Sequence, residues 1–114
     1  MQRPDLIARL DAVVAELSHV GEGWAPAPEL YVLAGRLAEA VDQWAEAAEA
    51  EEDAHLLDDS EPLTRASAVA TVAAVRLRHW SKTGNARLVP SLLLTMRALR
   101  AVLADGSLAA AAEG

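Results

Sequence analysis

Four segments of this 114-residue chain carry apolar residues at alternating steps of three and four, which places them along one face of an α-helix. Glycine, proline or short polar residues separate the segments and interrupt helical backbone. A chain of this length can bury one core but not two independent ones. We therefore expect an all-α protein, an antiparallel up-down-up-down four-helix bundle. The four rows are Leu6, Leu10, Val13, Leu17 and Val20; Leu30, Leu33, Leu37, Ala40, Trp44, Ala47 and Ala54; Leu63, Ala66, Ala70, Ala73, Leu77 and Trp80; and Leu92, Met96, Leu99 and Leu103.

The expected helices differ in length. The first runs from about Pro4 to Val20, and the second from about residue 30 to residue 57. The third follows a turn at residues 58–60 and stops at residues 83–85, and the fourth begins near Pro90 and ends at residues 105–106. The central hairpin should therefore protrude beyond the outer two helices. We expect a single domain over residues 1–106 and a disordered tail at residues 107–114.

Charge is divided sharply along the sequence. Residues 29–61 hold eleven acids against Arg36 alone, whereas residues 62–104 hold seven basic residues and no acid, in a chain of net charge −7. Nine of the ten basic residues are arginine and alanine is frequent, which suggests a GC-rich, bacterial genome. Complementary charges of this kind can pair either within one chain or between two chains.

The distal half of the central hairpin is rich in alanine. Alanine permits close backbone approach but buries little area, so a monomer would leave this surface partly exposed to solvent. We expect a second copy to cover it and form a dimer. The alternative is that alanine serves only as a helix former on an exposed face. The candidate self-association surface comprises Ala47, Ala50, Ala54, Ala66 and Ala70.

The acidic residues of the second helix recur at steps of three and four, so they share one face. Paired carboxylates could hold a divalent cation, and a metal-dependent nucleotide hydrolase built on Glu46, Glu49 and Asp53 is one hypothesis. No neighbouring helix offers matching carboxylates, however, and the pattern Glu52-x-x-His55 occurs once where a di-iron bundle needs it twice. His55 also falls at the opposite end of the bundle from His19 and His79. We therefore expect a solvated acidic face and neither metal nor cofactor.

The turn between the third and fourth helices collects basic groups. The segment RLRHWSKTGNAR supplies them, and the loop bearing Trp24 should lie at the same end of the bundle. Phosphate contacts with stacking on an aromatic ring would bind nucleic acid or a nucleotide. Against this, Trp80 belongs to the buried row, and the net negative charge repels nucleic acid at long range. The candidate contact residues are Arg76, Arg78, His79, Lys82, Arg87 and Trp24.

Other functions have less support in the sequence. There is no cysteine, no glycine-rich phosphate loop and no context for a nucleophilic serine, so we do not expect an enzyme. No uncharged apolar stretch is long enough to cross a membrane, and we expect a cytoplasmic protein. The leading hypothesis is an acidic bundle that acts by protein–protein interaction, as a self-associating regulator or scaffold with an unidentified protein partner. Nucleic-acid association through residues 76–87 is the alternative.

Overall fold

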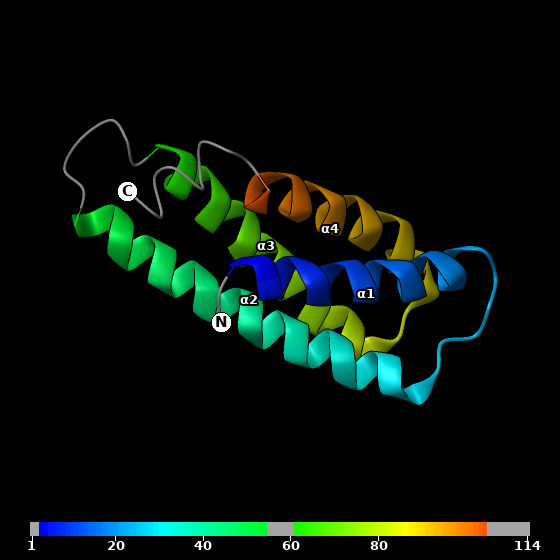
Figure 1. Ribbon diagram of the computed structural model, residues 1–114. Helices are drawn as coiled ribbons and strands as arrows, with labels where there is room; N and C mark the ends of the chain where they lie inside the picture. Colours follow the sequence, from blue (N-terminus) through cyan, green and yellow to red (C-terminus); the bar gives the residue numbers. More distant parts are fainter. Residues whose placement is uncertain (1–2, 55–60, 105–114) are drawn as a thin grey trace.

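The computed structural model describes residues 3–54 and 61–104, with the backbone alone at 51–54 and 61–64. Within them the chain forms four α-helices: α1 (Arg3–Gly21), α2 (Pro28–Ala54), α3 (Glu61–Thr83) and α4 (Val89–Leu103), with a short 3₁₀ helix, η2 (Ala86–Leu88), before α4. The expected all-α four-helix bundle is confirmed (Figure 1). The expected turn at 58–60, the stop at 105–106 and the tail at 107–114 lie outside the described residues.

The helices form a ring of four in which each consecutive pair is adjacent and α1 closes the ring against α4. Helix α2 therefore lies diagonally across the bundle from α4. The central helices are the longest, with 27 residues in α2 and 23 in α3 against 19 in α1 and 15 in α4. The α2–α3 hairpin extends past α1 and α4 at the end away from the α1–α2 loop, as the sequence predicts (Figure 1).

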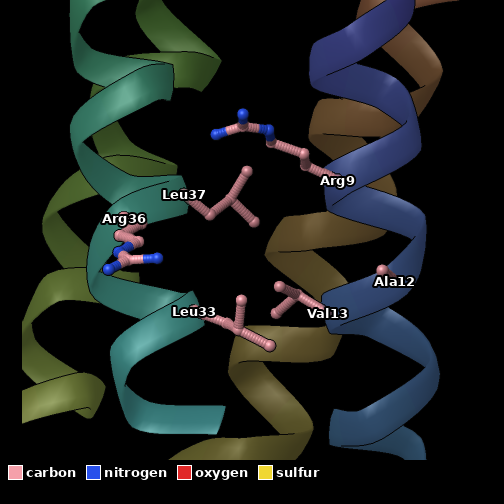
Figure 2. Close-up of a pocket in the computed structure, with 6 residues that line it drawn as sticks. All are labelled: Arg9, Ala12, Val13, Leu33, Arg36 and Leu37. Atoms are coloured by element: carbon pink, nitrogen blue, oxygen red, sulfur yellow. The ribbon is translucent and has the colours of Figure 1, made fainter. Parts of the chain in front are cut away.

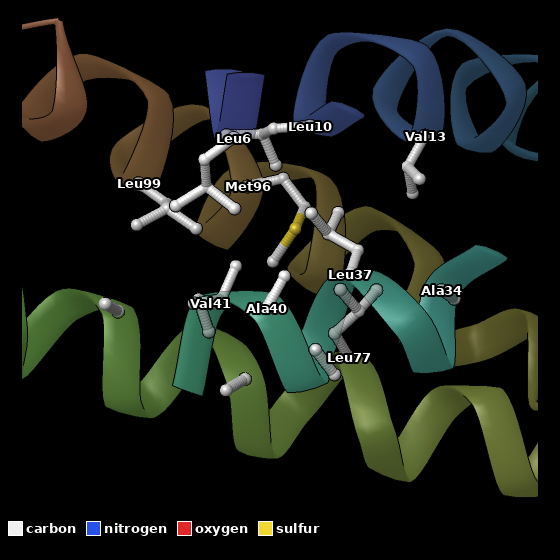
Figure 3. Packing of buried hydrophobic residues seen from close by; sticks show 14 of the residues in the cluster. Leu6, Leu10, Val13, Ala34, Leu37, Ala40, Val41, Leu77, Met96 and Leu99 are labelled. Atoms are coloured by element: carbon white, nitrogen blue, oxygen red, sulfur yellow. The ribbon is translucent and has the colours of Figure 1, made fainter. Parts of the chain in front are cut away.

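All four helices contribute to one apolar core. Leu10 of α1, Leu37 of α2 and Met96 of α4 point toward one another in the middle of the bundle, with Leu77 of α3 beneath them (Figure 3). The predicted rows on α1 and α4 are buried at Leu6, Leu10, Val13 and Leu17 and at Leu92, Met96, Leu99 and Leu103. The row on α3 is buried at Ala66, Ala70, Ala73, Leu77 and Trp80, and Ala74 joins it.

The row predicted on α2 is wrong in part. Leu33 is 46% exposed and Ala47 is exposed, whereas Leu30, Leu37 and Ala40 are buried as expected. The buried set is displaced around the helix toward α3 because small side chains on both helices allow the two backbones to approach closely. Its other members are Ala34, Ala38, Val41, Ala45 and Ala48.

Polar contacts tie neighbouring helices together at the edges of the core. Asp42 of α2 and Arg78 of α3 are 3.4 Å apart, and Asp11 of α1 lies 2.8 Å from Arg100 of α4. These pairs are close to half exposed, so each contributes at most about 1 kcal/mol. Their geometric role is clearer: each joins an acid of the N-terminal half to an arginine of the C-terminal half.

The α3–α4 turn depends on a glycine that lies against an aromatic ring. Helix α3 ends at Thr83, and the following residue, Gly84, has a φ of +62° in the left-handed region. A Cβ there would stand 3.1 Å from the hydroxyl oxygen of Tyr31, which stacks on the buried Trp80 with ring centroids 5.0 Å apart. The start of α2 is thereby held against the end of α3.

Adding a side chain at Gly84 should therefore destabilise the fold. We expect Gly84→Ala to lower the free energy of unfolding by about 1 kcal/mol or more, because the backbone conformation and the Tyr31 contact both oppose a Cβ. The matched control is Gly35→Ala within α2, where the nearest foreign atom is 3.8 Å away and helix propensity should raise stability. Urea denaturation of both variants measures the difference, and equal effects would contradict this account.

Enlarging a buried alanine between α2 and α3 should also be costly. Ala70 is completely buried, so Ala70→Leu should destabilise the bundle by about 1–3 kcal/mol through overpacking. The same change at exposed Ala8 of α1 should alter stability by about 0.5 kcal/mol or less. Chemical denaturation monitored by circular dichroism compares the two. Tolerance of leucine at residue 70 would show that the helices are not closely packed there.

Candidate functional site

The basic residues predicted to converge at the α3–α4 turn are divided among different sides of α3. The Arg76 guanidinium donates a 2.8 Å hydrogen bond to the Thr95 hydroxyl of α4, whereas Arg78 turns to the other side and pairs with Asp42 of α2. His79, Lys82 and Arg87 are exposed. The turn therefore presents fewer available cations than the sequence suggests.

Two tryptophans lie near this end of the bundle in different environments. Trp80 is buried, as its place in the apolar row predicts, and cannot stack on a ligand. Trp24 is 70% exposed on the α1–α2 loop, which lies at the same end as the α3–α4 turn (Figure 1). An exposed aromatic ring and two exposed cations, those of Lys82 and Arg87, are what remain of the predicted anion site.

Among the side chains of α2 that the structure describes, the acidic face shows no arrangement for holding a metal. Asp42 is engaged by Arg78, while Glu39, Glu46 and Glu49 are exposed to solvent. No group of three possible metal ligands occurs among the residues whose side chains are described. His19 is 3.8 Å from Glu22 at the end of α1, and both side chains are largely exposed. The side chains of Asp53 and His55 lie outside the described set.

The alanine surface predicted for self-association is split by the packing of α2 on α3. Ala66 and Ala70 are completely buried within the chain, so they belong to the contact between these helices and not to its surface. The small size that suggested a contact surface is used inside the chain instead. Ala47 and Ala50 are exposed on α2, and the side chain of Ala54 is not described.

Helix α3 carries a second row of exposed, mainly apolar residues that the sequence pattern did not predict. Ala68, Val72, Val75 and His79 recur at steps of four, three and four, and all are exposed. Val72 and Val75 keep 48% and 59% of their surface accessible. A helix with a second apolar row in addition to its buried one has a face suited to another helix.

A groove runs between α1 and α2, with a volume of about 270 Å³. Leu33 and Leu37 point into it from α2, and Val13 points into it from α1 (Figure 2). Arg9 and Arg36 complete the lining with Ala12. No hydrogen bond or ion pair joins either guanidinium to another described residue.

The sequence contained a partial signal for this groove. Arg36 is the one basic residue among the eleven acids of residues 29–61, and a lone cation in such a stretch is worth placing. Apolar spacing does not reveal the groove, because Leu33 fits the row of α2 that is predicted to face the core. Its exposure follows from the rotation of α2 toward α3, which spacing alone does not reveal.

Comparison with protein-family models, with curated proteins and with solved structures finds no match to this chain. The function must therefore be argued from the surfaces themselves. Among the helices described, none is both long enough and apolar enough to cross a membrane.

Proposed function

We propose that the protein is a self-associating interaction module, with a regulatory or scaffolding role, that pairs with a second copy through the outer face of the α2–α3 hairpin. The observation that carries the proposal is the exposed row on α3 beside an acidic helix. The row supplies apolar surface, and the neighbouring charges supply orientation.

The Asp42–Arg78 pair fixes how the two helices lie side by side. Residues three and four positions from a given residue share its face of a helix, so Glu39 and Glu46 flank Asp42 on α2. By the same rule Lys82 and Val75 flank Arg78 on α3. The outer face of the hairpin is therefore acidic along α2 and apolar and basic along α3.

This division of charge selects one mode of pairing. If α2 faced α2 of a second copy, two acidic helices would lie against each other. If α2 faces α3 of the second copy, an acidic helix lies against a basic one. A two-fold axis parallel to the helices achieves the second arrangement twice, because each copy contributes one acidic and one basic helix. Exposed Ala50, four positions after Glu46 on α2, would permit close approach to the valine row. The result is a closed, self-complementary dimer.

Light scattering with size-exclusion chromatography at micromolar concentration tests the proposal. We expect a dimer in low salt and weaker association in high salt, because the complementary charges are exposed. Val75→Glu should raise the dimer dissociation constant roughly tenfold or more, since it buries a carboxylate opposite an acidic helix. The variant should remain folded because the side chain is exposed in the monomer.

Leu94→Glu provides the matched control. Leu94 is 67% exposed on α4, outside the hairpin, so the same change in charge and polarity should leave the dimer intact. A strict monomer at every salt concentration would reject self-association. Equal weakening by the two variants would place the interface elsewhere.

Nucleic-acid association is a second candidate, favoured by exposed Trp24 at the same end as Lys82 and Arg87. If these groups bind a single strand, changing both Lys82 and Arg87 to Ala should weaken binding and reduce its dependence on salt by about one unit of slope per residue. Fluorescence anisotropy with a labelled single-stranded oligonucleotide measures both. Arg97→Ala on α4 is the control, and absence of binding by the unaltered protein eliminates this candidate.

A further inference from the structure

The groove between α1 and α2 is built from residues that the dimer does not use. Its floor is apolar, formed by Val13, Leu33 and Leu37, and Leu33 remains 46% exposed within it (Figure 2). Across the groove α1 offers Val13, Ala12 and the flexible side chain of Arg9, and these leave Leu33 partly uncovered. The bundle thus leaves open a space that an added apolar side chain would fill.

The charge around this floor is opposite to that of the molecule. Arg9 of α1 and Arg36 of α2 line the groove, and neither has a hydrogen-bonding or ionic partner among the described residues. The contrast with Arg78 and Arg100 is informative, because those two arginines are paired with acids of neighbouring helices. In a chain of net charge −7, two unpaired guanidiniums at one apolar groove select an anionic partner.

We propose that this groove docks a helix of another protein that presents an apolar side chain flanked by carboxylates. Two antiparallel helices with a groove between them accept a third helix along their length, with its apolar residues inserted at steps of three and four. Carboxylates at the edges of that apolar face would reach Arg9 and Arg36. The apolar floor favours a helix over nucleic acid, because Leu33 and Leu37 can contact an inserted apolar side chain but not a phosphate backbone.

The proposal does not depend on the dimer, because the groove lies between α1 and α2 and the dimer face lies between α2 and α3. A synthetic helical peptide tests the docking proposal. It carries leucines at alternating steps of three and four and glutamates elsewhere. A sister peptide carries glutamine in place of each glutamate. Fluorescence anisotropy of labelled peptide measures binding to the full chain.

We expect the glutamate peptide to bind and the glutamine peptide to bind at least about tenfold more weakly, since charge-assisted hydrogen bonds are lost. Changing both Arg9 and Arg36 to Gln should weaken the glutamate peptide similarly and leave the glutamine peptide nearly unaffected. Leu33→Asp should weaken both peptides. Because these side chains make no described polar contact and Leu33 is half-exposed, circular dichroism should show folded variants.

Two controls separate the groove from the rest of the surface. Arg97→Gln removes an exposed arginine of α4 and should not change peptide affinity, and Val75→Glu tests whether the peptide binds the α3 row instead. The proposal is overturned if the glutamate peptide does not bind, or if it binds the Arg9 and Arg36 variant unchanged. It is also overturned if that variant loses self-association, because the occupant would then be a second copy.

Discussion

Close packing between α2 and α3 determines where every other surface of this protein lies. Alanines on both helices meet in the contact, and Ala70 of α3 is completely buried there. Close approach favours a side of α2 that carries small buried residues, among them Ala34, Ala38, Ala45 and Ala48. Helix α2 therefore turns its alanine side toward α3, and its larger residues must be accommodated elsewhere.

Leu33 shows the consequence of that rotation. A leucine at the correct spacing for the core instead faces the junction with α1, where it remains 46% exposed beside Val13. The same rotation directs Arg36 toward the groove and leaves Asp42 beside Arg78. Arg36 therefore lies in the lining of the groove, while Asp42 lies on the α3 side of the same helix.

Much of the fold could be predicted from the sequence. The rows predicted on α1, α3 and α4 agree with the buried residues, and Gly84 marks the end of α3. On α2, apolar residues occupy two adjacent rows, and both satisfy steps of three and four. The choice between those rows depends on the size of the facing side chains of α3, which are distant in sequence. Spacing alone could not make that choice.

The basic residues predicted to converge at the α3–α4 turn are dispersed for a different reason. Arg76 and Arg78 are two positions apart, and residues so spaced on a helix point in divergent directions. They accordingly reach Thr95 on one side and Asp42 on the other. A cluster in sequence is therefore dispersed in space wherever the chain is helical. The reverse holds for Arg9 and Arg36, which are far apart in sequence and line one groove.

The place of α2 in the ring gives the two proposed surfaces a physical relation. A helix in a four-membered ring has two neighbours and one outward side, and α2 faces the groove on its α1 side and the proposed dimer contact on its outward side near α3. Because rigid helices transmit displacement along their length, a shift of α2 away from α1 would press it against the buried alanines of α3, and close-packed interiors resist compression. The alanine contact therefore resists such a shift. We infer that a helix entering the groove must fit the existing separation of α1 and α2, so side-chain size and charge would select its partner more than rearrangement of the bundle.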